Sequence, residues 1–376
     1  MKNKFLLPIV LFIGACSSIP TNDQDKSLNT LIQKPEFNYK ISSLPKSINL
    51  YFFKNKETSA LPLAIQGFVE NFYFYNTKIS YRPEIFLSPI KAGECNIKDE
   101  KQELIIAFNF SNDVGAASYK ECIRSLPKGK TLYVSDFDDN LGFSNFFIAS
   151  RKEERSELIN SIEESSNRFV VIDSKKTIDK ETISRLLEEN KKEVVELKTY
   201  DENSSSQDLF EEVLMVNRSK ERMRKLSRRI SEKITGNSRA REDLDAFFLS
   251  VDLKEARNLK PALDYISEKD YEVFILNSWQ TNSNYDSLDE DLKGSIHADF
   301  PIMMPIKIPE FISKEKRSRE YALGYDTFEI ILLKYGLSNQ NNFVYKGLSG
   351  KIVLKNKKIL RSAYVFKITG EGLEIL

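Results

Sequence analysis

Two apolar runs of strand length, Glu103-Leu-Ile-Ile-Ala-Phe108 and Lys130-Thr-Leu-Tyr-Val-Ser135, give the clearest indication of fold class in this chain. A helical pattern lies between them, at about 113–125. A strand that is buried on both faces reads as a continuous apolar run, as strands of parallel sheets do. This order therefore predicts two parallel strands joined by a crossover helix.

The same alternation extends in both directions along the chain. Further strands are expected at 47–53, 79–87, 145–149, 168–172, 194–197, 245–251 and 272–276. Helical patterns separate many of them, the longest helical pattern spans 315–335, and a hairpin closes the chain at 351–368. Strands that alternate with helices are typical of parallel sheets covered by helices on both faces. We predict an α/β fold.

The N-terminus has the pattern of a bacterial lipoprotein signal. Lys2 and Lys4 precede a short apolar run at 5–13, and Gly14-Ala15-Cys16 follows it directly. The run is too short to span a bilayer as a helix, which needs about 20 residues. We predict a signal peptide at 1–15, lipidation of Cys16 and a polar tether at 16–45. An ordinary signal peptide with a chance cysteine is the alternative. Ser17 in place of aspartate indicates the outer membrane.

Composition excludes several classes of function. The formal net charge is +1, which gives no case for a nucleic-acid partner. His297 is the only histidine, so zinc sites built from several imidazoles are excluded, and it is expected to be an exposed strand residue. No phosphate-binding loop, dinucleotide fingerprint or nucleophile elbow is present. We predict no catalytic residue, no metal and no cofactor.

Two cysteines remain once Cys16 carries lipid. An exported protein occupies a compartment that permits disulfides, so Cys95 and Cys122 can form a bridge. Two separate buried thiols are an equally good interpretation.

A basic run extends from residue 218 to residue 241, where ten lysines and arginines face only two glutamates. One interpretation is a partner-docking surface formed by Arg222, Arg224, Arg228 and Arg229. The alternative, which the pattern favours, is a helix that packs one apolar side on the core and leaves its basic side in solvent. That apolar side would consist of Met223, Leu226, Ile230 and Ile234.

Several segments resemble the LppC-type lipoproteins, the penicillin-binding protein activator family. The segments are Ser238-Arg-Ala-Arg-Glu-Asp-Leu-Asp-Ala-Phe-Phe-Leu249, Leu292-Lys-Gly-Ser-Ile-His-Ala-Asp-Phe-Pro301, Tyr321-Ala-Leu-Gly-Tyr-Asp326 and Tyr345-Lys-Gly-Leu-Ser-Gly-Lys-Ile-Val-Leu354, with Arg361 after them. The resemblance covers about 208–366 in sequence and is topological over 46–207. The resemblance is to the C-terminal domain of the family and does not include the large N-terminal helical-repeat domain of the best-known members.

The resemblance implies a periplasmic-binding-protein type I fold with two doubly wound lobes and parallel sheets. Lobe one would hold about 46–140 and 279–338, and lobe two about 141–278 and 339–376. Members of the family are outer-membrane regulators that stimulate bifunctional peptidoglycan synthases, and they are not enzymes. The resemblance therefore implies a synthase as partner and an outer-membrane, lipid-anchored location.

A second function, a lipid-anchored receptor for a small ligand, follows from the same fold. Ligands of open α/β sheets bind beyond the carboxyl ends of the strands. The lining of such a cleft would come from Asn109, Ser111, Asn112, Asp136, Asn277, Ser278 and Trp279. One departure argues against it: the first strand continues into Phe53-Lys-Asn-Lys-Glu57, where the family usually has a glycine that permits close backbone approach.

Overall fold

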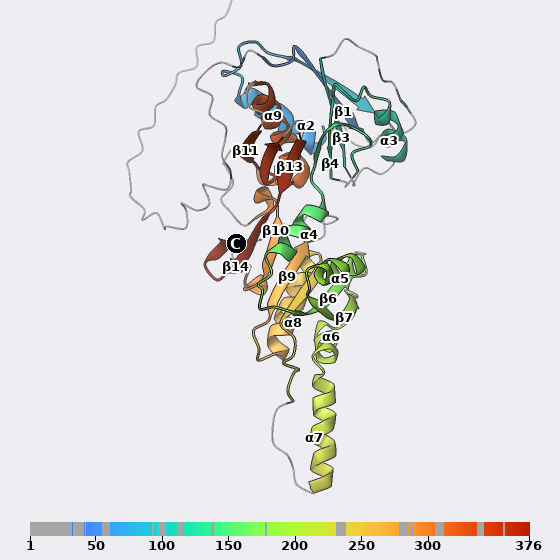
Figure 1. Ribbon diagram of the computed structural model, residues 1–376, viewed down its shortest axis with the longest axis vertical. Helices are drawn as coiled ribbons and strands as arrows, with labels where there is room; N and C mark the ends of the chain where they lie inside the picture. Colours follow the sequence, from blue (N-terminus) through green and yellow to red (C-terminus); the bar gives the residue numbers. More distant parts are fainter. Residues whose placement is uncertain are drawn as a thin grey trace, which may run out of the picture.

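A computed structural model shows two lobes stacked along the long axis, with one helix, α7, projecting from the second lobe (Figure 1). It describes residues 32, 41, 43–54, 61–91, 94–95, 97, 103–110, 116–136, 139–176, 179–230, 238–277, 285, 289–304, 312–336, 342–355 and 358–376. The predicted signal peptide at 1–15, Cys16 and most of the predicted tether lie outside the described residues.

Lobe one contains a five-stranded sheet in which every pair of neighbours is parallel, in the order β2-β1-β3-β4-β5. Its strands are β1 (Ser47–Phe53), β2 (Glu84–Ile90), β3 (Leu104–Asn109), β4 (Thr131–Ser135) and β5 (Asn145–Ile148). Alternate side chains of β1, β3 and β4 enter two different cores. One core contains α2 (Leu63–Phe74) and α9 (Arg319–Gly336), and the other contains α3 (Ala116–Arg124). The lobe is therefore doubly wound, as predicted.

Helices α2 and α9 approach each other closely because glycines lie at their contact. A Cβ atom built on Gly324 would be 1.8 Å from the carbonyl oxygen of Ala64, and one on Gly67 would be 2.3 Å from that of Tyr321. The glycine of the Tyr-Ala-x-Gly-x-Asp segment thus serves packing. The aspartate that follows, Asp326, is buried and accepts hydrogen bonds from the Ser349 and Leu348 amides at 2.7 and 3.0 Å. The helical segment and the closing hairpin segment of the family resemblance therefore meet in lobe one.

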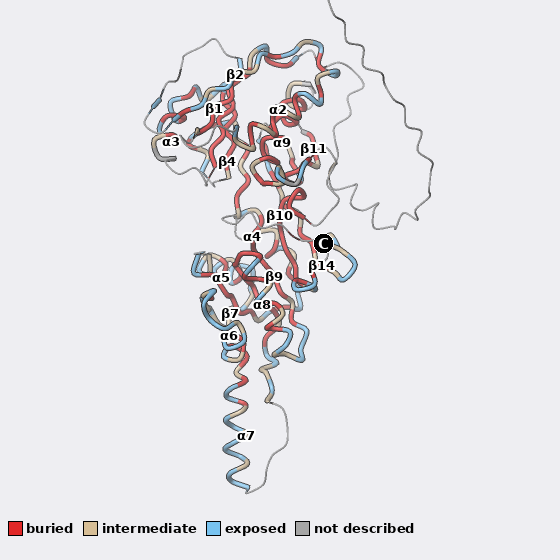
Figure 2. The backbone as a smooth tube through the Cα atoms, turned by 180° about the vertical axis from the view of Figure 1, so that it is seen from behind, coloured by how far each residue is buried: buried red, intermediate tan, exposed pale blue. Residues whose placement is uncertain are grey.

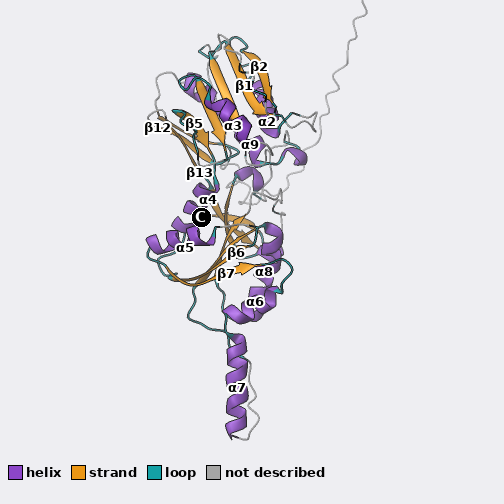
Figure 3. Cartoon of the chain, turned by 90° about the vertical axis from the view of Figure 1, so that its right-hand side faces the viewer, coloured by secondary structure: helices purple, strands orange, loops and turns teal. Residues whose placement is uncertain are grey.

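Lobe two contains a seven-stranded sheet in the order β15-β14-β10-β9-β8-β6-β7. Five strands are parallel: β6 (Arg168–Ser174), β7 (Glu193–Tyr200), β8 (Ala246–Val251), β9 (Glu272–Asn277) and β10 (Ile296–Asp299). Two antiparallel strands, β14 (Tyr364–Thr369) and β15 (Gly372–Ile375), complete one edge. Helices α4 (Arg151–Asn160) and α5 (Lys180–Glu189) cover one face, and α6 (Ser206–Val213) and α8 (Leu253–Ile266) cover the other (Figure 3).

A third, antiparallel sheet of β11 (Asn342–Lys346), β12 (Lys351–Lys355) and β13 (Lys358–Ser362) packs in lobe one. Its inward side chains, which include Phe343, Ile352 and Leu354, belong to the core that contains α9. The burial colouring shows buried backbone through both lobes and a mostly exposed α7 (Figure 2).

The lobe boundaries differ from the expected ones in three places. Strand β5 at 145–148 pairs with β4 in lobe one, although lobe two was expected to begin at about 141. Strand β10 pairs with β9 and β14 in lobe two, and the β11–β13 sheet joins lobe one. The physical reason is that short apolar strands pair with whichever sheet edge is open, which an alternation pattern does not specify. Within the described residues, the chain passes between the lobes after β5, after β10 and after β13.

Candidate functional site

The carboxyl ends of strands in both lobes lie at the junction of the lobes. Strand β5 of lobe one leads directly into α4, whose first residue, Arg151, reaches lobe two. One guanidinium nitrogen of Arg151 lies 3.4 Å from the Ser250 hydroxyl and 3.4 Å from the Leu276 carbonyl oxygen, at the ends of β8 and β9. This is the position where a ligand of this fold would bind.

The structure describes three of the seven predicted cleft residues. Asn109 is fully buried at the end of β3, and its amide donates to the Tyr133 hydroxyl at 2.8 Å. Asp136 follows the end of the neighbouring strand β4 and is half-buried. Asn277 ends β9 in lobe two and is fully buried. Ser111, Asn112, Ser278 and Trp279 lie outside the described residues.

The polar groups at the strand ends of lobe two bind one another. Arg151 pairs with Asp179 at 2.7 Å, and Arg155 reaches the other carboxylate oxygen of Asp179 at 2.8 Å. Asp179 in turn donates its backbone N–H to the carboxylate of Asp173, at the end of β6, at 2.9 Å. Burial lowers the pKa of Arg151, and the charge of Asp179 opposes that shift. The protein's own ion pairs therefore occupy Arg151, Arg155 and Asp179, while the side chain of Asn277 has no hydrogen-bond partner among the described residues.

Two buried charge pairs connect the lobes at the same junction. Arg319, at the start of α9 in lobe one, makes a two-point contact with Asp299 of β10 in lobe two, at 2.6 and 3.0 Å. Arg361 of β13 lies over the Phe300 ring, 3.8 Å from its centroid, and 3.7 Å from Glu154 of α4. The Arg319 and Asp299 side chains are 8% and 0% exposed. Breaking either pair leaves an uncompensated buried charge, so these contacts resist separation of the lobes.

The sequence did not predict the charge pairs that connect the lobes at this junction. Asp299 and Arg361 lie in segments quoted for the family resemblance, but no local pattern indicates which distant charge each one meets.

His297, on the same strand as Asp299, is fully buried, and the expectation of an exposed residue is wrong. The His297 ring stacks on Phe366 and meets Tyr285 edge to face, so neighbouring aromatic rings cover it. Burial lowers the pKa of His297 to about 3.

Helix α7 (Val216–Ile230) is the second candidate site. Its base is fixed to lobe two: the Arg239 amide donates to the Ser219 hydroxyl at 3.0 Å, and the Arg241 amide donates to the Leu214 carbonyl at 2.9 Å. Beyond its base the helix extends away from both lobes (Figures 1 and 3).

The side chains on the outer part of α7 are exposed. Leu226 and Ile230 are 52% and 49% exposed, so the favoured interpretation, an apolar side packed on the core, is wrong. Ile234 lies outside the described residues. The four predicted partner-surface residues are exposed on this helix: Arg222, Arg224, Arg228 and Arg229.

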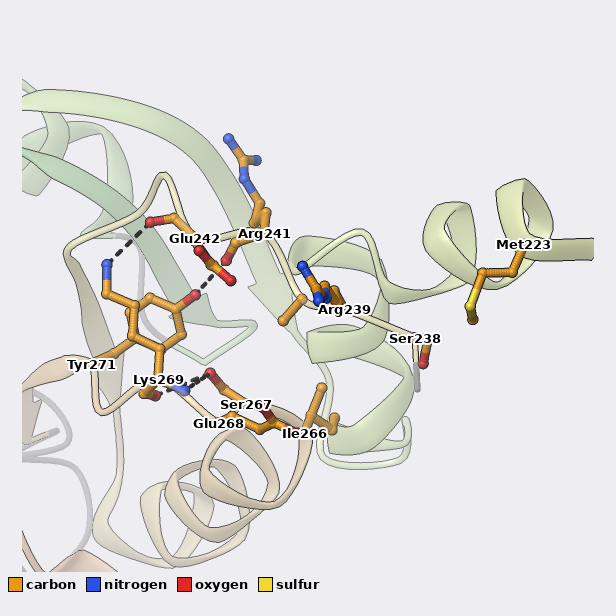
Figure 4. Close-up of a pocket in the computed structure, with 11 residues that line it drawn as sticks. Met223, Ser238, Arg239, Arg241, Glu242, Ile266, Ser267, Glu268, Lys269 and Tyr271 are labelled. Carbon is orange, nitrogen blue, oxygen red and sulfur yellow. Dashed lines mark hydrogen bonds between the residues drawn. The ribbon is translucent and has the colours of Figure 1, made fainter. Parts of the chain in front are cut away.

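A cavity of about 920 Å³ lies at the base of α7 (Figure 4). Met223 of α7, Arg239, Arg241, Ile266 and Tyr271 are among its lining residues. The Tyr271 hydroxyl donates to the Arg241 carbonyl at 2.6 Å, and this contact holds the 238–242 segment against the lobe.

Two cationic side chains at the rim of this cavity, Arg241 and Lys269, make polar contacts. The Arg241 guanidinium contacts Asp243 at 2.6 Å, which holds the pKa of that carboxyl below its usual range and raises the pKa of Arg241. Lys269, also in the lining, donates to the Glu242 carbonyl at 3.2 Å. These contacts hold the rim in place and offer no nucleophile with an adjacent base.

Cys95 and Cys122 form a disulfide. Of the two interpretations of these cysteines, the structure therefore supports the bridge and not two separate thiols. The disulfide ties α3 to the segment that follows β2 in lobe one.

Among the described residues no group of histidine, cysteine or acidic side chains is arranged to hold a metal ion. No helix in the described part of the chain is both long and apolar enough to cross a membrane.

Comparison with known proteins first gives a family match. Residues 184–363 match the family described as LppC putative lipoprotein. The match runs from within α5 to the end of β13, which includes α7, the cavity and the Arg319–Asp299 pair of the junction. A comparison with curated proteins gave no match.

Solved structures share the fold at low sequence identity. Full-length LpoA from Haemophilus influenzae is 12% identical with a TM-score of 0.56, over 90% of this chain and 60% of that protein. Its C-domain, described as a regulator of PBP1A, is 11% identical with a TM-score of 0.54, over 88% of this chain and 99% of that one. A putative branched-chain amino acid ABC transporter protein from Chromobacterium violaceum is 14% identical with a TM-score of 0.50, over 87% and 99%. These similarities confirm the periplasmic-binding-protein type I fold, and the chain spans about 60% of full-length LpoA.

Proposed function

We propose that this protein is an outer-membrane lipoprotein that regulates peptidoglycan synthesis by binding and activating a bifunctional penicillin-binding protein. The LppC match over residues 184–363 carries the proposal. The fold shared with the LpoA C-domain, a regulator of PBP1A, supports the same class of partner. The signal pattern that ends at Cys16 supports a lipid anchor.

The lobe junction favours a regulator over a small-ligand receptor. A receptor needs polar groups that converge on the ligand and remain available to it. Here Arg151 bonds to Asp179, Ser250 and Leu276, and the Arg319–Asp299 pair connects the lobes. A protein with these internal contacts acts through its outer surfaces, and the chemistry of synthesis belongs to the partner.

The activating role can be tested with the purified synthase of the same bacterium. Peptide cross-linking would be measured with and without this protein, prepared without residues 1–16 so that it needs no membrane. We expect a rise in cross-linking that saturates with the added protein. Unchanged cross-linking, with circular dichroism showing a folded protein, would contradict activation.

The membrane location needs a separate test. A chain with Cys16→Ser is expected to leave the outer-membrane fraction and to lose incorporation of radiolabelled palmitate. Retention of both by the variant would contradict lipidation at Cys16.

A further inference from the structure

Helix α7 carries an apolar stripe with the spacing of helices that dock in grooves. Met223, Leu226 and Ile230 stand at positions i, i+3 and i+7, which share one side of a helix. Leu226 and Ile230 are about half exposed, and Met223 is partly exposed. Large apolar side chains clustered on an exposed surface indicate an interaction site, whereas single ones do not.

Arginines flank this stripe on both sides. Arg222 and Arg229 lie along one side of the stripe, and Arg224 lies along the other, as the helical repeat requires. The glutamate of the helix, Glu221, pairs with Lys225 at 2.7 Å. Among the described residues, no carboxylate lies within ion-pair distance of the Arg222, Arg224 or Arg229 side chains. Their charges are therefore available to carboxylates of another molecule.

We propose that α7 is the docking element of this regulator, and that it inserts Met223, Leu226 and Ile230 into an apolar groove rimmed by carboxylates on the synthase. This inference rests on the proposed function, because it assigns the surface through which the synthase is bound. Arginine forms two-point bonds with carboxylates, and it is enriched at protein interfaces.

The composition of α7 argues for a protein groove over a membrane surface. Helices that lie on membranes usually present tryptophan, phenylalanine or leucine over a broad apolar face. In the part of α7 that the structure describes, the exposed apolar side consists of three residues and contains no aromatic residue. Its narrow stripe with arginines on both sides matches a groove whose two rims are acidic.

The base of α7 makes the helix a prepared docking element. The bonds from the Arg239 and Arg241 amides hold the returning chain against α6 and α7. A binding element that is already ordered loses less conformational freedom when it binds. Met223 also lines the cavity at the base, so the stripe continues into a recess on lobe two.

The test compares two α7 variants with a charge-matched control. One variant carries Arg222→Gln, Arg224→Gln and Arg229→Gln, and the other carries Leu226→Ser and Ile230→Ser. The control removes three exposed positive charges from the β12–β13 hairpin in lobe one: Lys351→Gln, Lys355→Gln and Lys358→Gln. Affinity for the purified synthase is measured at 50 and 200 mM salt, together with binding to vesicles that contain 30% phosphatidylglycerol.

We expect each α7 variant to bind the synthase about tenfold more weakly than the unmodified chain, with the control within about twofold. The arginine variant is also expected to lose most of the salt dependence of binding. Synthase binding that neither variant weakens would overturn the inference and leave the proposed function standing.

Two other outcomes also overturn the inference. Vesicle binding that the α7 variants abolish, with synthase binding unchanged, would assign α7 to a membrane surface. Failure of the unmodified chain to bind the synthase would overturn the proposed function together with the inference.

Discussion

Charged side chains are buried and paired at the lobe junction, whereas on helix α7 they are exposed. At the junction, Arg319 and Asp299 are buried and bonded to each other. On α7, Arg222 and Arg229 are exposed, and an apolar stripe lies beside them in solvent. Buried pairs determine how parts of one chain fit together, whereas exposed charges and apolar side chains remain available to a partner. We therefore expect changes at the junction to reduce stability and changes on α7 to reduce binding.

The largest expected effect comes from breaking a pair at the junction. Asp299→Asn removes the carboxylate charge that binds the buried guanidinium of Arg319. We expect a loss of about 3–5 kcal/mol in the free energy of unfolding, measured by urea denaturation. A loss below about 1 kcal/mol would show that water reaches Arg319 and that the junction does not hold the lobes.

The buried His297 should make the protein less stable in acid. Its pKa is about 3 in the folded chain, against about 6.5 when unfolded. Below pH 6.5 His297 is protonated in the unfolded state, whereas in the folded state it stays neutral until the pH falls to about 3. The free energy of unfolding therefore decreases as the pH falls over that range. The cost between pH 7 and pH 4 is about 3 kcal/mol.

His297→Gln should remove this part of the pH dependence. The readout is the slope of unfolding free energy against pH, which a general loss of packing does not change. An unchanged slope in the variant would contradict a neutral, buried His297.

A packing change in lobe one should have a smaller effect. Gly324→Ala places a methyl group 1.8 Å from the Ala64 carbonyl oxygen, so α2 and α9 must separate. We expect a loss of about 1–3 kcal/mol, seen as a lower melting temperature. Exposed Gly129, which has nothing within 4 Å of a built Cβ, provides the control, and its alanine variant should melt close to the unmodified chain.

The smallest stability effect is expected on α7. Leu226→Ser with Ile230→Ser changes side chains that are about half exposed, so the free energy of unfolding should change by no more than about 0.5 kcal/mol. A loss of 2 kcal/mol or more, by the same urea measurement, would mean that the stripe packs within the chain and is not available to a partner.

The sequence was sufficient for many of the regular elements, although strands β11 and β15 were not predicted. Continuous apolar runs predicted β1, β3, β4, β6 and β8, because strands buried on both faces need apolar residues at every position. The sequence did not predict which sheet each of the strands β5, β10 and β11 joins. Strand pairing depends on contacts between distant segments, which a local pattern does not specify. His297 shows the same limit, because an alternating run does not show which residues of other elements will cover each face of the strand.

The candidate sites were less predictable than the fold. The period of α7 correctly located its apolar side but does not tell whether anything covers that side. Asn109 and Asn277 were placed at strand ends correctly, yet both are fully buried. The pairs Arg319–Asp299 and Arg361–Glu154 join residues from different lobes, and no spacing rule connects them.

The return of the chain to lobe one has a consequence for biosynthesis. Strands β1 to β5 end at residue 148, but α9, which packs on one face of their sheet, is complete only at residue 336. At 5–20 residues per second, a ribosome needs about ten to forty seconds to make the intervening chain. Throughout that interval the apolar side chains of β1, β3 and β4 that face α9 lack this cover. A chain that ends before α9 therefore leaves apolar side chains of this sheet without one of their packing partners.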